Sequence, residues 1–183
     1  MTEVMISISS KWCKLIVTGE KTVEIRKTKP NVEPPFKCYV YCKVNDEMLF
    51  VGDGDDHLYP CNGKVMGEFV CDKIYDVVAK CRSGAVTKYT FGWNSGEERH
   101  CMTFNDVHNY LNQRSGYAWR ITQLKVYDKP KDIGEFLHNC PCRSAKNCNL
   151  KAQCGRDASS CNGLVPLKYP FQGWGTVFAT YKG

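Results

Sequence analysis

Most apolar residues in this chain alternate with polar ones, and a period of two is typical of half-buried β-strands. Five segments follow this pattern: 22–26, 36–44, 64–73, 117–127 and 174–181. Helical spacing is convincing only in 10–19 and 104–111, with a further helical turn expected near 133–137. The pattern therefore predicts an α+β fold, in which five or six strands form a small curved mixed sheet or barrel beside two or three short helices.

The length and the ends of the chain limit its class. A chain of 183 residues is long enough for one domain with an appendage. Its apolar stretches are far shorter than the ~18–20 residues that cross a bilayer, so we expect no membrane contact. The first residues carry neither the basic nor the long apolar segment of a secretion signal, and we expect a cytoplasmic protein.

Charge is distributed unevenly along the chain. The formal net charge is +6. Between Lys11 and Lys43 there are eight basic residues and three acidic ones, whereas residues 44–60 carry only acidic charges. A basic face of this kind permits a polyanionic partner, although charge runs are more often solvated surface.

Residues 19–26 read Gly-Glu-Lys-Thr-Val-Glu-Ile-Arg and directly follow the first predicted helix. They match the pattern G-x-K-T-x-E-x-R, and two later passages, 63–69 and 116–121 with its continuation 127–130, match in the same order. With these motifs the chain resembles the ASCH domain, a branch of the PUA-like superfamily found in bacteria and in phages or prophages. The resemblance covers about residues 4–137. It implies a PUA-like β-barrel with a cleft beside the first helix and a role in handling RNA or modified nucleosides.

The side chains of the first motif suit a nucleic acid. Lys21 and Arg26 supply positive charge, and Glu24 can orient them or accept hydrogen bonds from a base edge. Trp12, and Tyr39 or Tyr41, can stack on a base, although Trp12 on an apolar helix face favours a core position. Taken alone, the charged groups would be interpreted as a surface ion-pair ladder; the resemblance places them at the cleft. The predicted nucleic-acid-binding residues are Lys11, Lys21, Thr22, Glu24, Arg26 and Lys27.

An enzyme is the main alternative to a binding module. Some ASCH proteins resemble amidohydrolases acting on acetylated cytidine, with a lysine, a threonine three residues later and a distant glutamate. Lys21 matches the lysine, but Glu24 stands at the threonine position, so this triad is incomplete. A hydrolase of an acylated nucleoside or an RNA phosphodiester would use Lys21, Glu24 and Glu68. A protein-interaction adaptor is a third hypothesis.

Twelve cysteines fall into two groups. Seven are scattered through the first hundred or so residues, and in a reducing compartment they are best interpreted as small buried hydrophobes. The other five lie within 22 residues: Cys140, Cys142, Cys148, Cys154 and Cys161. This segment has too little apolar content to order itself, which favours structural zinc held by four thiolates. Disulfides or redox-active thiols, and unliganded cysteines, are the alternatives.

These patterns divide the chain into three parts. Residues 1–137 form the ASCH-like domain, 138–163 a Cys-rich loop insertion, and 164–183 a C-terminal strand that returns to the barrel. The leading functional hypothesis is a module that binds RNA or a modified nucleoside.

Overall fold

The computed structural model describes residues 1–139 and 164–179, apart from positions 45, 46, 53, 55, 56, 94, 95 and 97. Its elements, in chain order, are β1 (Glu3–Ile8), α1 (Ser10–Val17), β2 (Val23–Arg26), β3 (Phe36–Cys42), β4 (Phe50–Gly52), β5 (Leu58–Pro60), β6 (Val65–Cys71), β7 (Ile74–Arg82), β8 (Ala85–Phe91), α2 (Phe104–Leu111), β9 (Gly116–Arg120), β10 (Thr122–Lys131), the 3-10 turn η1 (Ile133–Glu135), β11 (Phe136–Asn139), β12 (Leu164–Pro166), β13 (Trp174–Thr176) and β14 (Phe178–Ala179).

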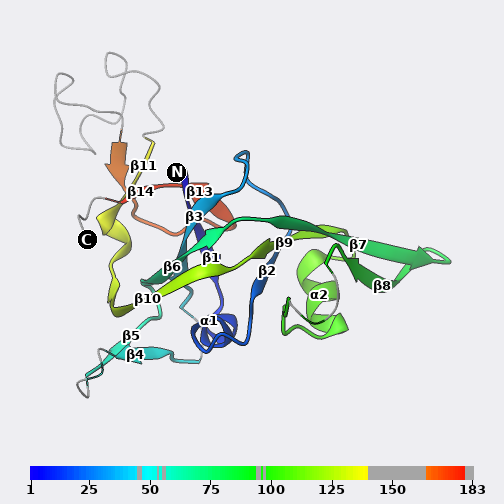
Figure 1. Cartoon of the computed structure of the whole chain (residues 1–183), viewed down its shortest axis with the longest axis horizontal. Helices are drawn as coiled ribbons and strands as arrows, with labels where there is room; N and C mark the ends of the chain where they lie inside the picture. Colours follow the sequence, from blue (N-terminus) through cyan, green and yellow to red (C-terminus); the bar gives the residue numbers. More distant parts are fainter. Residues whose placement is uncertain are drawn as a thin grey trace, which may run out of the picture.

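The main sheet has five strands in the order β10-β6-β3-β1-β13 (Figure 1). β1 and β3 run parallel, because α1, β2 and a loop lie between them and carry the chain back to the same end of the sheet. The other neighbours are antiparallel. β13, from the end of the described chain, pairs with β1 so that Gly175 lies opposite Met5.

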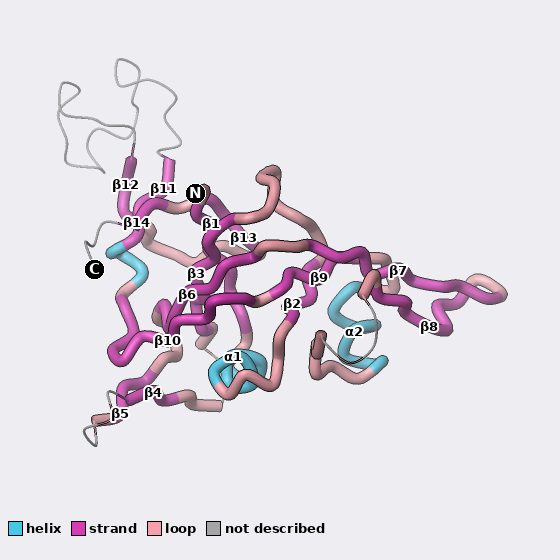
Figure 2. Tube along the Cα trace, in the orientation of Figure 1, coloured by secondary structure: helices cyan, strands magenta, loops and turns pink. Residues whose placement is uncertain are grey.

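A second sheet, in the order β2-β9-β7-β8, is covered by α2. Val23 and Ile25 of β2 pack with Val107 and Leu111 of α2, since alternate residues of a strand share a face. The neighbouring residues of β2, Glu24 and Arg26, therefore project from the opposite face. Figure 2 shows β2 passing between α1 and α2, and the β7–β8 ribbon extending beyond the rest of the second sheet.

The largest core cluster joins the two sheets. Ile6 of β1, Cys13 of α1, Val40 of β3 and Trp119 of β9 all belong to it and are 0% exposed. The rings of Phe36 and Trp119 meet edge to face, with centroids 5.4 Å apart. Burial of these side chains fixes α1 and the start of β2 against the main sheet.

The predicted mixed β fold with two α-helices is confirmed in its coarse form. Both helices lie where expected, and the second begins with the capping box of Thr103 and Asp106. The described residues contain more strands than the five or six expected, among them the short β4–β5 ribbon and the longer β7–β8 ribbon. The segment expected as one strand at 174–181 contains the separate strands β13 and β14. Among the described residues, no helix has the length and apolar character that crossing a bilayer requires.

Candidate functional site

Lys21, Glu24 and Arg26 converge on one another. Gly19 ends α1 with a positive φ of 72°, and the backbone N–H of Lys21 then donates to the carbonyl of Leu15 at 2.8 Å. This turn places Lys21 Nζ 3.4 Å from Glu24 Oε2. The other carboxylate oxygen, Oε1, lies 3.5 Å from Arg26 Nη1. One carboxylate thus bridges two cations, and we call these three residues the charge cluster.

The two cations also donate to backbone carbonyls of distant segments. Lys21 Nζ donates to the oxygen of His100 at 2.7 Å. Arg26 donates through Nη1 to the oxygen of Ser7 at 3.2 Å and through Nη2 to that of Gly173 at 2.6 Å. The charge cluster therefore ties β2 to β1, to the segment before α2 and to the segment before β13.

The charge cluster is buried. The side chains of Lys21, Glu24 and Arg26 are 0%, 8% and 6% exposed. The surface ion-pair ladder expected from composition alone is therefore wrong, and Lys21 has no direct access to solvent. Buried charges must be paired and hydrogen-bonded, and these contacts meet that requirement. Glu24 keeps the largest exposed fraction of the three.

Basic and aromatic side chains from α1, β2 and α2 lie around this cluster. Lys11 Nζ lies 4.3 Å from the centre of the Trp12 ring, and Lys21 Nζ lies 5.2 Å from it. Lys27 Nζ lies 5.4 Å from the centre of the Tyr110 ring. Both lysines 11 and 27 are exposed, whereas both aromatic rings are half-buried.

Electrostatic effects show that these groups are close to the charge cluster. Burial raises the pKa of Tyr110, while Arg26 acts to lower it and Glu24 to raise it. Hydrogen bonds from Thr103 lower the pKa of Asp106 on α2. The charge of Lys11 on α1 lowers it further by a smaller amount. Lys11, Trp12, Lys27 and Tyr110 thus form a continuous basic and aromatic neighbourhood, which we call the α1–α2 surface.

Comparison with solved structures bears on the fold. The crystal structure of ASCH from Zymomonas mobilis superposes with a TM-score of 0.51 at 15% identity, over 91% of this chain and 88% of that one. A Ser-to-Ala variant of the same protein gives 0.52 at 14% identity, over 96% and 87%. The chain has an ASCH-like fold. No protein-family model matches the sequence, and no curated protein sequence matches it either.

The ASCH-like fold does not bring Glu68 to the charge cluster as the hydrolase hypothesis requires. Glu68 lies on β6, where it binds Lys37 Nζ at 3.2 Å and accepts a hydrogen bond from the Tyr127 hydroxyl at 2.6 Å. Its neighbour Phe69 points the other way, into the core that joins the two sheets. Glu24 lies on that core side, close enough to contribute to the raised pKa of Cys13 there.

Tyr39, Tyr41 and Thr22, which were expected at the site, make other contacts in the structure. Tyr39, considered as a base-stacking residue, is 1% exposed and packs against Phe136 with ring centroids 4.9 Å apart. Tyr41 is buried in the same cluster. The hydroxyl of Thr22 accepts the backbone N–H of Arg99 at 2.8 Å, so Thr22 positions the segment before α2.

Sequence reasoning missed four partners of the site. Ser7, His100 and Gly173 contribute backbone oxygens, which leave no signature in the sequence. Tyr110 lies beside Val107 and Leu111 on α2. The apolar spacing of this helix is visible in the sequence, so a position of Tyr110 near β2 could have been predicted.

The predicted metal ligands, Cys140, Cys142, Cys148, Cys154 and Cys161, lie outside the described residues. Within the described part, no three His, Cys, Asp or Glu residues are grouped so that they could hold a metal ion. Five of the seven scattered cysteines are buried free thiols, as predicted, whereas Cys81 and Cys101 are exposed.

Proposed function

We propose that this chain is an RNA-binding module and that the α1–α2 surface contacts the RNA. The observation that carries the proposal is the pairing of two exposed lysines, Lys11 and Lys27, with two half-buried aromatic rings, Trp12 and Tyr110. Lysines bind phosphates, and aromatic rings stack on unpaired bases with little dependence on sequence.

In this proposal the charge cluster has a positioning role. Its hydrogen bonds to three separate segments hold β2, and hence Lys27, in place beside α2. Glu24 pairs with both cations on the core side of β2 and holds them in place. A modified base is a ligand of the same class, since its ring would stack on the aromatic side chains in the same way.

The burial of Lys21 favours binding over hydrolysis. A catalytic lysine has to reach the substrate or its proton. The ammonium of Lys21 donates to the carbonyl of His100 and pairs with Glu24, and its side chain is 0% exposed. The exposed lysines beside it are suited to holding phosphates.

The test is fluorescence anisotropy with a labelled single-stranded RNA across a range of salt concentrations. Binding through phosphates weakens as salt rises, and each phosphate contact contributes about 0.7 to the slope of log Kd against log salt for a single strand. We expect Lys11→Gln and Lys27→Gln each to reduce this slope by about that amount. Lys125→Gln is the matched control, because Lys125 is exposed on β10 in the main sheet.

Trp12→Leu and Tyr110→Leu test the stacking part. Each is expected to weaken binding of single-stranded RNA with little change in the salt slope. A slope near zero for the wild-type chain, or equal effects of Lys125→Gln and Lys27→Gln, contradicts the proposal.

A further inference from the structure

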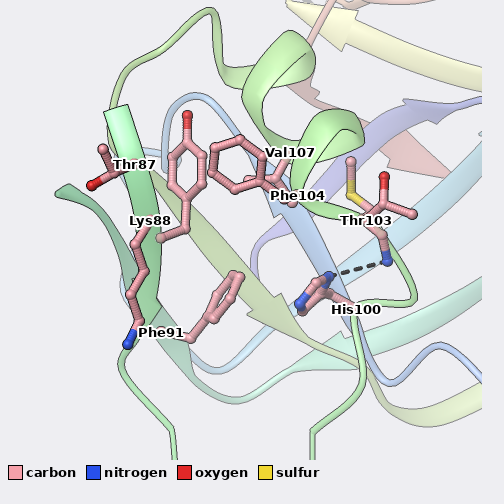
Figure 3. A pocket seen from close by; sticks show the side chains of 9 residues that line it. Thr87, Lys88, Phe91, His100, Thr103, Phe104 and Val107 are labelled. Atoms are coloured by element: carbon pink, nitrogen blue, oxygen red, sulfur yellow. Dashed lines mark hydrogen bonds between the residues drawn. The ribbon is translucent and has the colours of Figure 1, made fainter. Parts of the chain in front are cut away.

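A second feature with binding chemistry lies between β8 and α2. It is a pocket of about 310 Å³, a size in the range of small-molecule sites. Figure 3 shows Thr87 and Lys88 on one side of it and Phe104 and Val107 of the helix across from them. Four aromatic side chains line it: Tyr89, Phe91, His100 and Phe104.

The aromatic rings of the pocket are arranged for stacking. The rings of Phe91 and His100 lie parallel to within 28°, with centroids 4.5 Å apart. The backbone N–H of Met102 donates to His100 Nδ1 at 3.1 Å and fixes that ring. Phe104 is the first residue of α2 and is 45% exposed. Part of its ring is therefore open to a ligand.

Two buried polar atoms beside these rings lack a hydrogen bond among the described residues. They are the hydroxyl of Tyr89, which lines the pocket, and Nδ1 of His108, whose ring lies 6.4 Å from that of Tyr89. Because neither atom has appreciable accessible surface, a ligand in the pocket would contact the faces of the rings and not these polar atoms.

The strand beside the pocket is basic. Lys80 of β7 and Lys88 of β8 lie directly opposite each other in the ladder, and like charges in that position destabilise a sheet. Arg82 follows on β7, and no acidic residue occurs from Val77 to Phe91. Opposed residues share a face and neighbours along a strand alternate, so both lysines project from the face opposite to Tyr89 and Phe91. β8 is the edge strand of this sheet, and only Lys88 of the two contributes to the pocket lining at that edge.

The pocket is also joined to the site described above. His100, whose ring forms one wall, accepts through its backbone oxygen the hydrogen bond from Lys21 Nζ. His100 therefore belongs both to the wall of the pocket and to the surroundings of the charge cluster.

We propose that the pocket between β8 and α2 receives one unpaired base of an RNA strand and that Lys88, at the edge of the sheet, binds an adjoining phosphate. This inference rests on the RNA binding proposed above and adds a base-binding subsite to it. Aromatic faces with a cation beside them are what single-stranded nucleic acid requires.

The experiment compares two labelled probes of equal length: a short RNA of randomised sequence and an oligomer of abasic ribose phosphates. Phe104→Ala is expected to raise Kd for the RNA by about five- to 150-fold, the effect of losing one stacked base, and to leave Kd for the abasic oligomer unchanged.

The charge part is tested with Lys88→Gln, which is expected to reduce the salt slope for both probes by about 0.7. Lys11→Gln reports separately on the α1–α2 surface. RNA binding that depends on Lys11 but is unchanged in Phe104→Ala and Lys88→Gln overturns this inference and leaves the proposed function standing. A loss in Phe104→Ala that is equal for both probes also overturns it. A wild-type chain that binds neither probe overturns both proposals.

Discussion

Replacing Lys21 by methionine tests whether the charge cluster holds the fold together. Methionine keeps most of the volume of lysine but removes the partner of Glu24 and the donor to the carbonyl of His100. Removing one member of a buried ion pair typically costs about 3–5 kcal/mol, because the remaining charge stays buried and uncompensated. Glu24 retains Arg26 at 3.5 Å, so we expect the lower end, about 3 kcal/mol.

The assay is urea unfolding followed by circular dichroism, with the melting temperature as a second measurement. A loss of about 3 kcal/mol corresponds to a decrease of roughly 6–12 °C for a chain of this length. Lys14→Met is the matched control on the same stretch of chain. Its ammonium lies 4.0 Å from a Glu47 oxygen, but the two side chains are 63% and 54% exposed, and such pairs contribute about 0–1 kcal/mol.

The double variant Lys21→Met/Glu24→Gln separates an unpaired charge from lost packing. A neutral glutamine removes the uncompensated carboxylate, and Arg26 keeps its hydrogen bonds to two backbone carbonyls. We therefore expect the double variant to lose less stability than the sum of the two single variants. Equal losses in Lys21→Met and Lys14→Met would refute the reasoning, since the buried pair would then behave like an exposed one.

Two further expectations concern stability. Burial, with a smaller effect from Lys21, holds the pKa of His100 below its usual value, so the unfolded chain binds the proton first on acidification. The free energy of unfolding should therefore fall as the pH drops below about 6.5, and His100→Gln should remove that part of the decrease in urea titrations at several pH values. At Gly67, a Cβ would lie 2.5 Å from the backbone oxygen of Lys125, and we expect Gly67→Ala to cost about 1–3 kcal/mol. Gly134→Ala, with open space around its Cβ, is the control, and equal melting temperatures for the two variants would contradict the argument.

The local pattern of the sequence was enough to place both helices and several strands. Trp12, Leu15 and Ile16 repeat with helical spacing, and Thr103 with Asp106 forms a capping box at the start of α2. The β7–β8 ribbon was not predicted, although residues 75, 77, 79 and 81 are apolar and share one face of β7. Such a ribbon depends on its pairing with β9 and its packing on α2, which are contacts between distant residues.

The resemblance to the ASCH motif grouped Lys21, Glu24 and Arg26, and the period of two places Glu24 and Arg26 on one face of the strand. The turn that brings Lys21 to them is seen only in the structure. Sequence reasoning misjudged their exposure and the place of Glu68. Exposure depends on which distant segments cover a side chain, and the carbonyls of Ser7 and Gly173 that do so carry no local signal.

Local periodicity and turn chemistry in this chain thus determined which residues form helices and strands and which side chains share a face, since both follow from backbone geometry over a few residues. Only the tertiary structure decided that the cations of the motif are buried, that Lys11 and Lys27 beside them are exposed, and that an aromatic pocket forms between β8 and α2. Those features arise where segments far apart in the sequence meet, and their free energies come from burial and pairing between those segments.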